Sequence, residues 1–391
     1  MSDLRQHIPL YTPTFFLGFA YHFLISLHFT NNAIYPLYVT HEGGGIAMVG
    51  IFMGIYSVSA VAGRPLVGYL IDRYGVRSIL ILGSLALSLP AFGYLFLLDQ
   101  GLLPFVWILR AVQGFGYGAH FTATFTLAAQ IAPPVRQNES IAMFGVSGLI
   151  GTAIGPYVGE YLVRTYGLNL FFIAMAFIGI SAALTISMIR VKKILPPPLP
   201  IIHSFLNLFR SANLTFVFVL AFLFAMSSNA ATTFLATVAK ARSISQFSLY
   251  FTAWGISGVS IRFIGGRWGD RIGPERVLIP GLFLYASGML TIHFSTSLIG
   301  FIIAGILVGT AHGVSFPAIT SFGYSRAPDR FKGSAMALIT GMMDAGGAVM
   351  ALVVGPLAEA FGLGIVFPIA ASASLIGCTL VVMNLHRHDK V

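Results

Sequence analysis

Polar side chains recur at helical spacing inside an apolar segment near residues 102–130. They are Arg110, Gln113, Tyr117, His120 and Thr124, each three or four residues after the one before, so they share one face of a helix. A guanidinium binds anions, an imidazole exchanges protons near neutral pH, and amides and hydroxyls bind uncharged polar groups. We interpret the stripe as the lining of a polar cavity. The alternative is that it only ties neighbouring helices together by hydrogen bonds.

Proton transfer needs groups that titrate. Asp344 is the only carboxylate well inside an apolar segment, and the proton affinity of such a group changes with its surroundings. His120 and His312 are also candidates for contact with protons or substrate, and hydrogen-bonded structural histidines are the alternative. The spacing of His and carboxylate residues shows no tight cluster, so no metal site is predicted.

The elements that must position these residues are helices that cross a membrane. Of the 391 residues, 57% are hydrophobic and 9% are charged, against roughly 25% charged in soluble domains. The formal charge of +10 falls in short segments between apolar runs, which favours membrane topology over nucleic-acid binding. A crossing needs about 20 apolar residues. We therefore predict an all-α membrane protein with 12 transmembrane helices.

Twelve apolar runs are separated by loop signals such as Ala132-Pro133-Pro134. They cover residues 14–38, 46–69, 78–98, 102–130, 139–163, 168–190, 213–238, 247–268, 277–296, 298–323, 333–358 and 363–384. If the amino terminus is cytoplasmic, sixteen Lys and Arg residues fall on that side and three on the other. We therefore predict a multi-pass protein of the cytoplasmic (inner) membrane with both termini in the cytoplasm. The first run is expected to stay as an anchor, because no cleavage signal accompanies it.

The longest connection lies at the centre of the chain. It contains Pro196-Pro197-Pro198, and a proline run makes a stiff extended spacer. We predict an amino-terminal six-helix bundle at 1–190, a cytoplasmic linker at 191–212 and a carboxy-terminal six-helix bundle at 213–391.

The two halves share a motif at the ends of the second and eighth runs. Arg, Gly, Asp, Arg and Gly recur at identical internal spacing with an offset of 198 residues, which indicates parallel duplicated halves. We predict a conformational latch there, with glycines allowing close helix approach and charges meeting at the membrane exit. Its residues are Gly68, Asp72, Arg73, Gly75 and Arg77 in the first half, and Gly266, Asp270, Arg271 and Gly273 in the second.

These motifs resemble those of the major facilitator superfamily. Gly68-x-x-x-Asp72-Arg73-x-Gly75-x-Arg77 is similar to its loop between helices 2 and 3, and Arg110-x-x-Gln113-Gly114 is similar to its helix-4 motif. Gly151, Gly155, Pro156 and Gly159 resemble its helix-5 motif, which is typical of exporters and antiporters. The sequence departs from the exporter pattern in two places. Glu160 stands where that pattern usually has glycine, and the first run has no carboxylate.

The resemblance implies a cavity between the two halves, lined by the first, fourth, seventh and tenth runs. Besides the stripe that starts at Arg110, the implied lining residues are His28, Asn31, Asn32, Tyr35, Asn229, Thr232 and His312. Because helices 2 and 11 are neighbours in the superfamily, we predict that Arg64 pairs with Asp344, either as a proton-coupling pair or as a static one. Arg110 receives a supporting electrostatic role, since a guanidinium does not release its proton. Pro156 either bends the fifth run as a gate or packs without gating.

The predicted function is secondary active transport of a small solute by alternating access, with proton-coupled efflux favoured. The alternative is a proton-linked importer of a small metabolite or an organic anion. No catalytic motif or phosphate-binding loop is present, so an enzyme is not predicted and no cofactor is expected. The expected partners are the small-molecule substrate, protons and the lipid bilayer, with the chain acting as a monomer and binding no nucleic acid.

Overall fold

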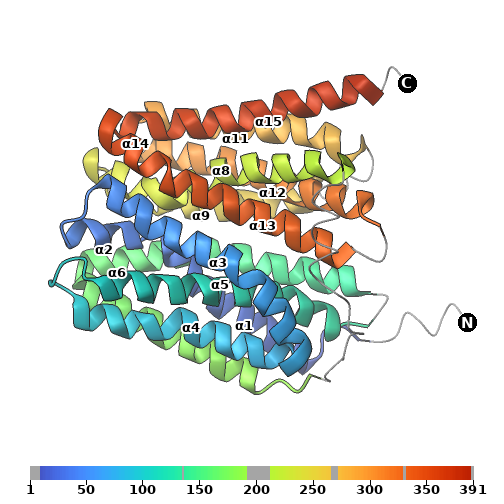
Figure 1. The fold of residues 1–391 in the computed structure, drawn as a ribbon, viewed down its shortest axis with the longest axis horizontal. Coiled ribbons are helices and arrows are strands. Elements are labelled where there is room, and N and C mark those ends of the chain that lie inside the picture. The colour runs from blue at the N-terminus through green and yellow to red at the C-terminus, as the bar shows by residue number, and fades with distance from the viewer. Residues whose placement is uncertain (1–8, 134–135, 192–211, 266–271, 329–331, 389–391) are drawn as a thin grey trace, which may run out of the picture. The chain divides into compact units, whose positions relative to one another are not determined.

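The computed structural model describes residues 9–133, 136–191, 212–265, 272–328 and 332–388. In these ranges the regular structure is entirely helical (Figure 1). The helices are α1 (Pro13–Thr30), α2 (Tyr35–His41), α3 (Ile46–Tyr74), α4 (Val76–Leu97), α5 (Pro104–Gln130), α6 (Gln137–Ser187), α8 (Ala212–Ala241), α9 (Leu249–Gly265), α11 (Pro274–Phe294), α12 (Leu298–Arg326), α13 (Lys332–Leu352), α14 (Val354–Phe361) and α15 (Val366–His388). The predicted all-helical fold is confirmed.

Each predicted apolar run coincides with a helix or with helical segments in series. The first run is broken, because a short 3-10 turn at Asn31–Ala33 separates α1 from α2. The fifth and sixth runs are joined in α6, which spans 51 residues and changes direction at Gly167, where φ is 82°. Eight helices of the described residues are long and apolar enough to cross a membrane.

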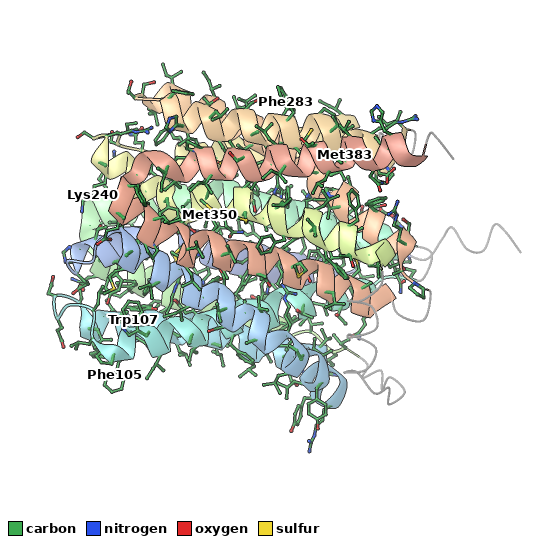
Figure 2. The ribbon with its side chains drawn as sticks, turned by 45° about the horizontal axis from the view of Figure 1, so that its top comes forward. Phe105, Trp107, Lys240, Phe283, Met350 and Met383 are labelled. Carbon is green, nitrogen blue, oxygen red and sulfur yellow. The ribbon has the colours of Figure 1, made fainter. Side chains whose placement is uncertain are left out.

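The outward-facing side chains of these helices are apolar. Phe105 on α5, Phe283 on α11 and Met383 on α15 are 66%, 59% and 50% exposed (Figure 2). Such exposure of large apolar side chains is costly in water and favourable in lipid. It agrees with helices that lie in a bilayer.

The chain divides into two compact units. Unit 1 comprises Met1–Asn32 and Ser59–Pro197, and unit 2 comprises Ala33–Val58 and Pro198–Val391. In unit 1, α6 packs along α1 and α4, and α4 also packs along α5. In unit 2, α12 lies against α9 and α11, while α8 lies against α13 and α15.

Residues 33–58 belong to the first bundle in the sequence-based division but pack within unit 2. The Nζ of Lys240 at the end of α8 donates to Thr40 Oγ1 at 3.3 Å. The carboxylate of Glu359 accepts from the backbone N–H of Ala47 in the first turn of α3, where the helix dipole favours a negative charge. A Cβ built on Gly50 would lie 2.9 Å from the Cα of Gly355. The division at 1–190 and 213–391 remains a prediction.

The duplication is visible in the backbone. Gly75 precedes α4 with φ of 86°, and Gly273 precedes α11 with φ of 88°. Only glycine adopts this conformation without strain, so the last glycine of the repeated motif is required by the turn. Part of the second copy of the motif lies outside the described residues, namely Gly266, Asp270 and Arg271. The linker at 192–211 also lies outside them.

Candidate substrate and proton sites

Arg110 forms the centre of a buried polar network in unit 1. Its side chain is 1% exposed and donates to Gln113 Oε1 at 3.1 Å and to Asn32 Oδ1. Gln113 also accepts from the hydroxyl of Tyr94 at 3.2 Å and donates to the carbonyl of Leu87. The network joins the end of α1 to α4 and α5. It holds a permanent positive charge inside the unit, as the supporting electrostatic role requires.

His120 lies further along α5 than Arg110 and Gln113, and it is fully buried. Its Nδ1 is 3.0 Å from the hydroxyl of Tyr21 on α1 and 3.1 Å from Thr124 Oγ1. Ser84 on α4 donates to the same tyrosine hydroxyl at 3.3 Å. These hydroxyls both donate and accept, so they can satisfy His120 in more than one protonation state.

The ring of His22 stacks on that of His120, with centroids 5.5 Å apart. His22 Nδ1 lies 2.8 Å from the carbonyl oxygen of Phe144 and 2.7 Å from Ser147 Oγ, both on α6. Sequence reasoning did not include His22, Tyr21 or Ser147 in the site. The spacing of the α5 stripe identified His120 and Thr124 but none of the partners that come from other helices.

The polar residues of α1 are also inside unit 1. His28 is 2% exposed, and neither of its ring nitrogens has a hydrogen-bond partner among the described residues. Its ring lies beside Gly179 of α6, where a built Cβ would be 3.4 Å from His28 Cδ2. Asn31, just past the end of α1, is 1% exposed and donates to the carbonyl of Leu27 in α1.

The α5 stripe therefore contacts α1 and α4 of its own unit. Tyr117 is half-buried and packs on Phe29 with centroids 5.4 Å apart. These contacts are those of the alternative interpretation, in which the stripe ties helices together. The cavity role of the stripe remains a prediction.

The predicted cavity residues of unit 2 lie on three elements. Tyr35 on α2 is buried and stacks on Phe52 with centroids 6.0 Å apart. Asn229 on α8 donates to the carbonyl of Ala225 at 3.0 Å, and Thr232 is half-buried on the same helix. His312 lies on α12.

His312 is surrounded by aromatic rings. Trp254, Phe224 and Phe316 have ring centroids 4.7, 5.4 and 5.6 Å from that of His312. Its Nδ1 is buried and has no hydrogen-bond partner in the described part of the chain. The surroundings of His312 are therefore much less polar than those of His120.

Arg64 and Asp344 belong to different units, so their pairing remains a prediction. On α3, Arg64 donates to Thr122 Oγ1 at 3.5 Å and lies 5.9 Å from the centroid of the Phe121 ring. Asp344 is partly buried on α13.

The helix-5 motif packs against α1. A Cβ on Gly151 would lie 2.4 Å from Ser26 Cβ, and one on Gly155 would lie 2.3 Å from Thr30 Oγ1. The predicted close approach at these two glycines is therefore present. Pro156 and Gly159 continue within α6, which keeps its helical assignment through both. The gating role of the motif remains a prediction.

The described part of the latch motif makes local contacts. Arg73 donates to the hydroxyl of Tyr69 at 2.7 Å, and Arg77 donates to the carbonyl of Ser187 at the end of α6. A Cβ on Gly68 would meet no atom within 4 Å among the described residues. The latch role of Gly68 remains a prediction. The side chain of Asp72 lies outside the described set.

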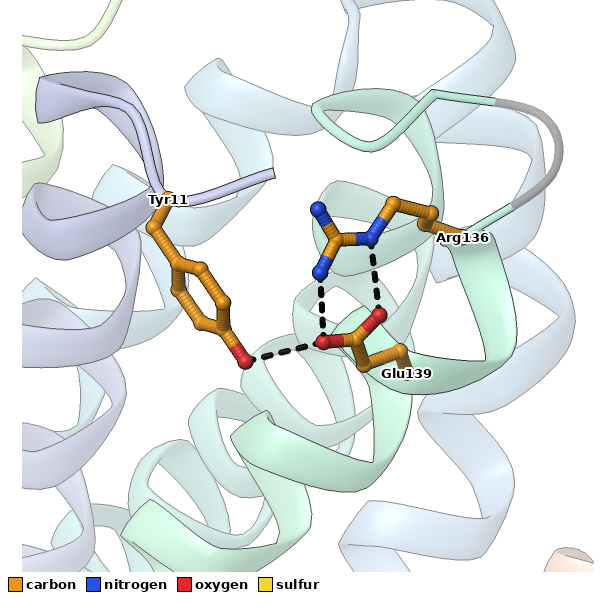
Figure 3. Close-up of polar contacts among 3 residues, drawn as sticks. All are labelled: Tyr11, Arg136 and Glu139. Atoms are coloured by element: carbon orange, nitrogen blue, oxygen red, sulfur yellow. Dashed lines mark hydrogen bonds and ion pairs between the residues drawn. The ribbon is translucent and has the colours of Figure 1, made fainter. Parts of the chain in front are cut away.

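Tyr11, Arg136 and Glu139 form a small cluster where α1 and α6 begin (Figure 3). Arg136 forms a two-point ion pair with Glu139 at 2.7 and 2.8 Å, and Tyr11 donates to Glu139 Oε1 at 2.9 Å. The hydrogen bond to Glu139 raises the pKa of the Tyr11 hydroxyl above its ordinary value of about 10. The same carboxylate raises the pKa of Arg136. The cluster ties two chain segments of unit 1 together.

Apolar helices that surround a few buried polar networks are typical of a polytopic membrane protein. The Major Facilitator Superfamily model matches residues 14–237 and 217–391. The chain belongs to this superfamily, and its fold is the superfamily fold, as the resemblance in its motifs implied. Members of the superfamily bind small-molecule substrates, and the chain is a multi-pass membrane transporter and not an enzyme.

Two relatives are similar to this chain along most of its length. The multidrug resistance protein MdtG of Enterobacter lignolyticus is 25% identical over 375 residues, covering 90% of this chain and 87% of the relative. The staphylopine export protein of Staphylococcus aureus is 22% identical over 366 residues, covering 87% and 88%. Among solved structures, a peptide transporter named POT matches with a TM-score of 0.76 and 15% identity, covering 95% and 94%. This last likeness shows the fold alone.

Proposed function

We propose that this chain is a proton-coupled exporter of small solutes. It lies in the cytoplasmic membrane with both termini in the cytoplasm, and it works as a monomer by alternating access between two bundles. The observation that supports export best is the helix-5 motif. Its glycines Gly151 and Gly155 lie directly against α1, and the motif as a whole resembles that of exporters and antiporters. The names of the two relatives, multidrug resistance and staphylopine export, point the same way.

Proton coupling is supported by the buried titratable groups. His120 lies among hydroxyls in unit 1, and Asp344 is a partly buried carboxylate on α13. A group that is reached from one side of the membrane, protonated, and then exposed to the other side carries a proton through the cycle. Arg110 fixes a positive charge in unit 1 and limits how many further protons that unit binds.

Everted membrane vesicles test this function. Vesicles from cells with and without the chain are acidified inside by respiration and given ethidium as the probe. The proposal predicts ethidium accumulation in the acidic lumen that requires the chain and is abolished by a protonophore. Accumulation that persists after the protonophore, or equal accumulation in vesicles without the chain, would contradict it.

A further inference from the structure

Two histidines from different helices of unit 1 meet face to face inside the unit. His22 on α1 and His120 on α5 are 4% and 0% exposed, and their rings stack with centroids 5.5 Å apart and an interplanar angle of 25°. Both are imidazoles, which are the side chains that gain and lose protons near neutral pH. A stacked pair of titratable rings is an unusual way to fill an apolar interior.

The hydrogen bonds of His22 fix where its proton sits. The carbonyl of Phe144 only accepts, so His22 Nδ1 at 2.8 Å must carry the hydrogen and donate. Ser147 Oγ also lies against Nδ1 and itself donates to the same carbonyl at 2.9 Å. The lone pair of the neutral ring is therefore on Nε2. A proton added to Nε2 leaves the existing Nδ1 hydrogen bonds intact.

The partners of His120 accommodate both of its charge states. Tyr21 and Thr124 place hydroxyls 3.0 and 3.1 Å from Nδ1. When Nδ1 is unprotonated a hydroxyl donates to it, and when it is protonated it donates to a hydroxyl oxygen. His120 Nε2 is buried and has no partner within the described ranges, so the hydroxyls at Nδ1 are the groups that stabilise the charged ring.

Few other charged groups act on the pair. From α1 the titratable neighbours are Tyr21 and His28, whereas α4 contributes Ser84 and α6 contributes Ser147, neither of which titrates. On α3, Arg64 reaches Thr122, two residues from His120. Two imidazolium rings 5.5 Å apart would repel each other. The pair therefore holds one proton at a time.

His312 of unit 2, the other histidine considered for proton contact, is placed differently. It has aromatic rings where His120 has hydroxyls, and its buried Nδ1 has no hydrogen-bond partner among the described residues. A charged ring without polar partners is costly to bury, so His312 is a poor place for an additional proton. Proton binding is therefore expected in unit 1 and not at His312 of unit 2.

We propose that His22 and His120 together form a single-proton binding site, and that this site carries the coupling proton. The inference rests on the proposed proton-driven export. The half-buried rings of Phe29 and Phe125 lie 5.6 and 6.1 Å from His120 and His22. The ring of Phe144 is also close, 5.9 Å from that of His22, but it is fully buried. Phe29 and Phe125 are therefore the partly exposed part of the aromatic cover, and their displacement would admit the proton.

Proton binding is measured without knowing the substrate. The full chain, labelled with ¹³C at histidine Cε1 and held in lipid nanodiscs, is titrated by NMR between about pH 5 and 8, with His22→Gln, His120→Gln and His312→Gln to assign the signals. We expect His22 and His120 to take up one proton between them, and the midpoint of His120 to move to higher pH in His22→Gln because its competitor is gone. We expect His312 to stay neutral. Phe125→Leu leaves both histidines in place and replaces the aromatic ring beside His22 with a smaller side chain. We expect this variant to speed proton exchange at the pair.

Two results would overturn the inference. One is that both rings stay neutral throughout the range, and the other is that they titrate independently with one proton each. Failure of the proposed export is read separately, since vesicles that show no proton-dependent ethidium accumulation report on transport whatever the NMR titration shows.

Discussion

The two units repeat one backbone plan but fill it with different chemistry. Gly75 and Gly273 hold the same backbone conformation before α4 and α11, so the duplicated turn is intact. The surroundings of the two candidate histidines diverge, with hydroxyls and a second imidazole around His120 and aromatic rings around His312. Duplication therefore supplies the scaffold, and the unequal side chains show where to look for coupling.

The largest expected effect is the difference in transport between substitutions at His120 and at His312. In everted vesicles, His120→Gln should lower proton-dependent ethidium accumulation at least about tenfold, equivalent to about 1.4 kcal/mol. His312→Gln should change it less than about twofold, because an aromatic cage has little need for a titratable group. Equal losses in the two variants, at matched protein amounts in the membrane, would remove the distinction between the units.

Where the duplication is intact, the units should respond alike. Gly75→Ala and Gly273→Ala each force a side chain into a backbone region that favours glycine, at a cost of about 1–3 kcal/mol. Thermal unfolding of the purified variants in detergent checks this. A loss in one variant and none in the other would show that the repeat is not structurally equivalent.

A smaller effect is expected at two glycines where one helix packs closely on another, Gly151 in unit 1 and Gly346 in unit 2, which we call the helix seams. The two units should respond alike there. A Cβ on Gly151 would lie 3.1 Å from the Ser26 carbonyl carbon, and one on Gly346 would lie 2.2 Å from the Phe222 carbonyl oxygen. Overpacking of this kind costs about 1–3 kcal/mol, partly offset by the better helix propensity of alanine, about 1 kcal/mol. We expect Gly151→Ala and Gly346→Ala to lower the melting temperature.

Gly68→Ala is the control for these seams, because its Cβ meets no described atom within 4 Å. It should be neutral or slightly stabilising in the same melting experiment. Destabilisation of Gly68→Ala equal to that of the seam variants would mean that steric contact is not the cause.

The smallest effect concerns two polar clusters at the helix ends. Tyr11 binds Glu139 in unit 1, and Asn384 donates to Glu275 at 2.9 Å in unit 2. The pKa of Tyr11 is raised in the folded chain by its hydrogen bond to Glu139, so its contribution to stability is complete below pH about 10 and is lost as the pH rises through the folded value.

We therefore expect Tyr11→Phe to lower the melting temperature near pH 8 by only about 1–2 °C, because the contact is exposed. At pH values well above about 10 the substitution should have no effect, because the hydroxyl has lost the proton that it donates. Asn384→Ala should show no such change with pH, because an amide does not titrate. Melting curves of both variants at several pH values check this, and a pH-independent effect of Tyr11→Phe would count against the assignment.

Much of the fold followed from local patterns. Apolar runs predicted the helices, and the motif ending in Gly75 predicted its copy ending in Gly273. The break between α1 and α2 was missed, although Pro36 in the first turn of α2 is a helix-start signal just after it. The packing of residues 33–58 within unit 2 has no local signal, since it depends on contacts distant in sequence.

The site was predicted less completely than the fold. The α5 stripe singled out His120, but in the sequence a histidine on an apolar helix looks the same whether it is a core residue or part of a site. Only the packing of α1 on its neighbours brings His22 onto His120 and Tyr21 onto Nδ1. The latch role of Gly68 stays a prediction, because a Cβ built there meets no described atom within 4 Å and its spacing alone names no partner.

The most direct test follows proton movement itself. Proteoliposomes that contain the chain and the pH indicator pyranine are loaded with ethidium and diluted into dye-free buffer. Exchange of solute for protons predicts that the lumen acidifies as ethidium leaves, and that His120→Gln abolishes the acidification. A lumen that turns alkaline, or that keeps its pH while ethidium leaves through the chain, would contradict proton-coupled export.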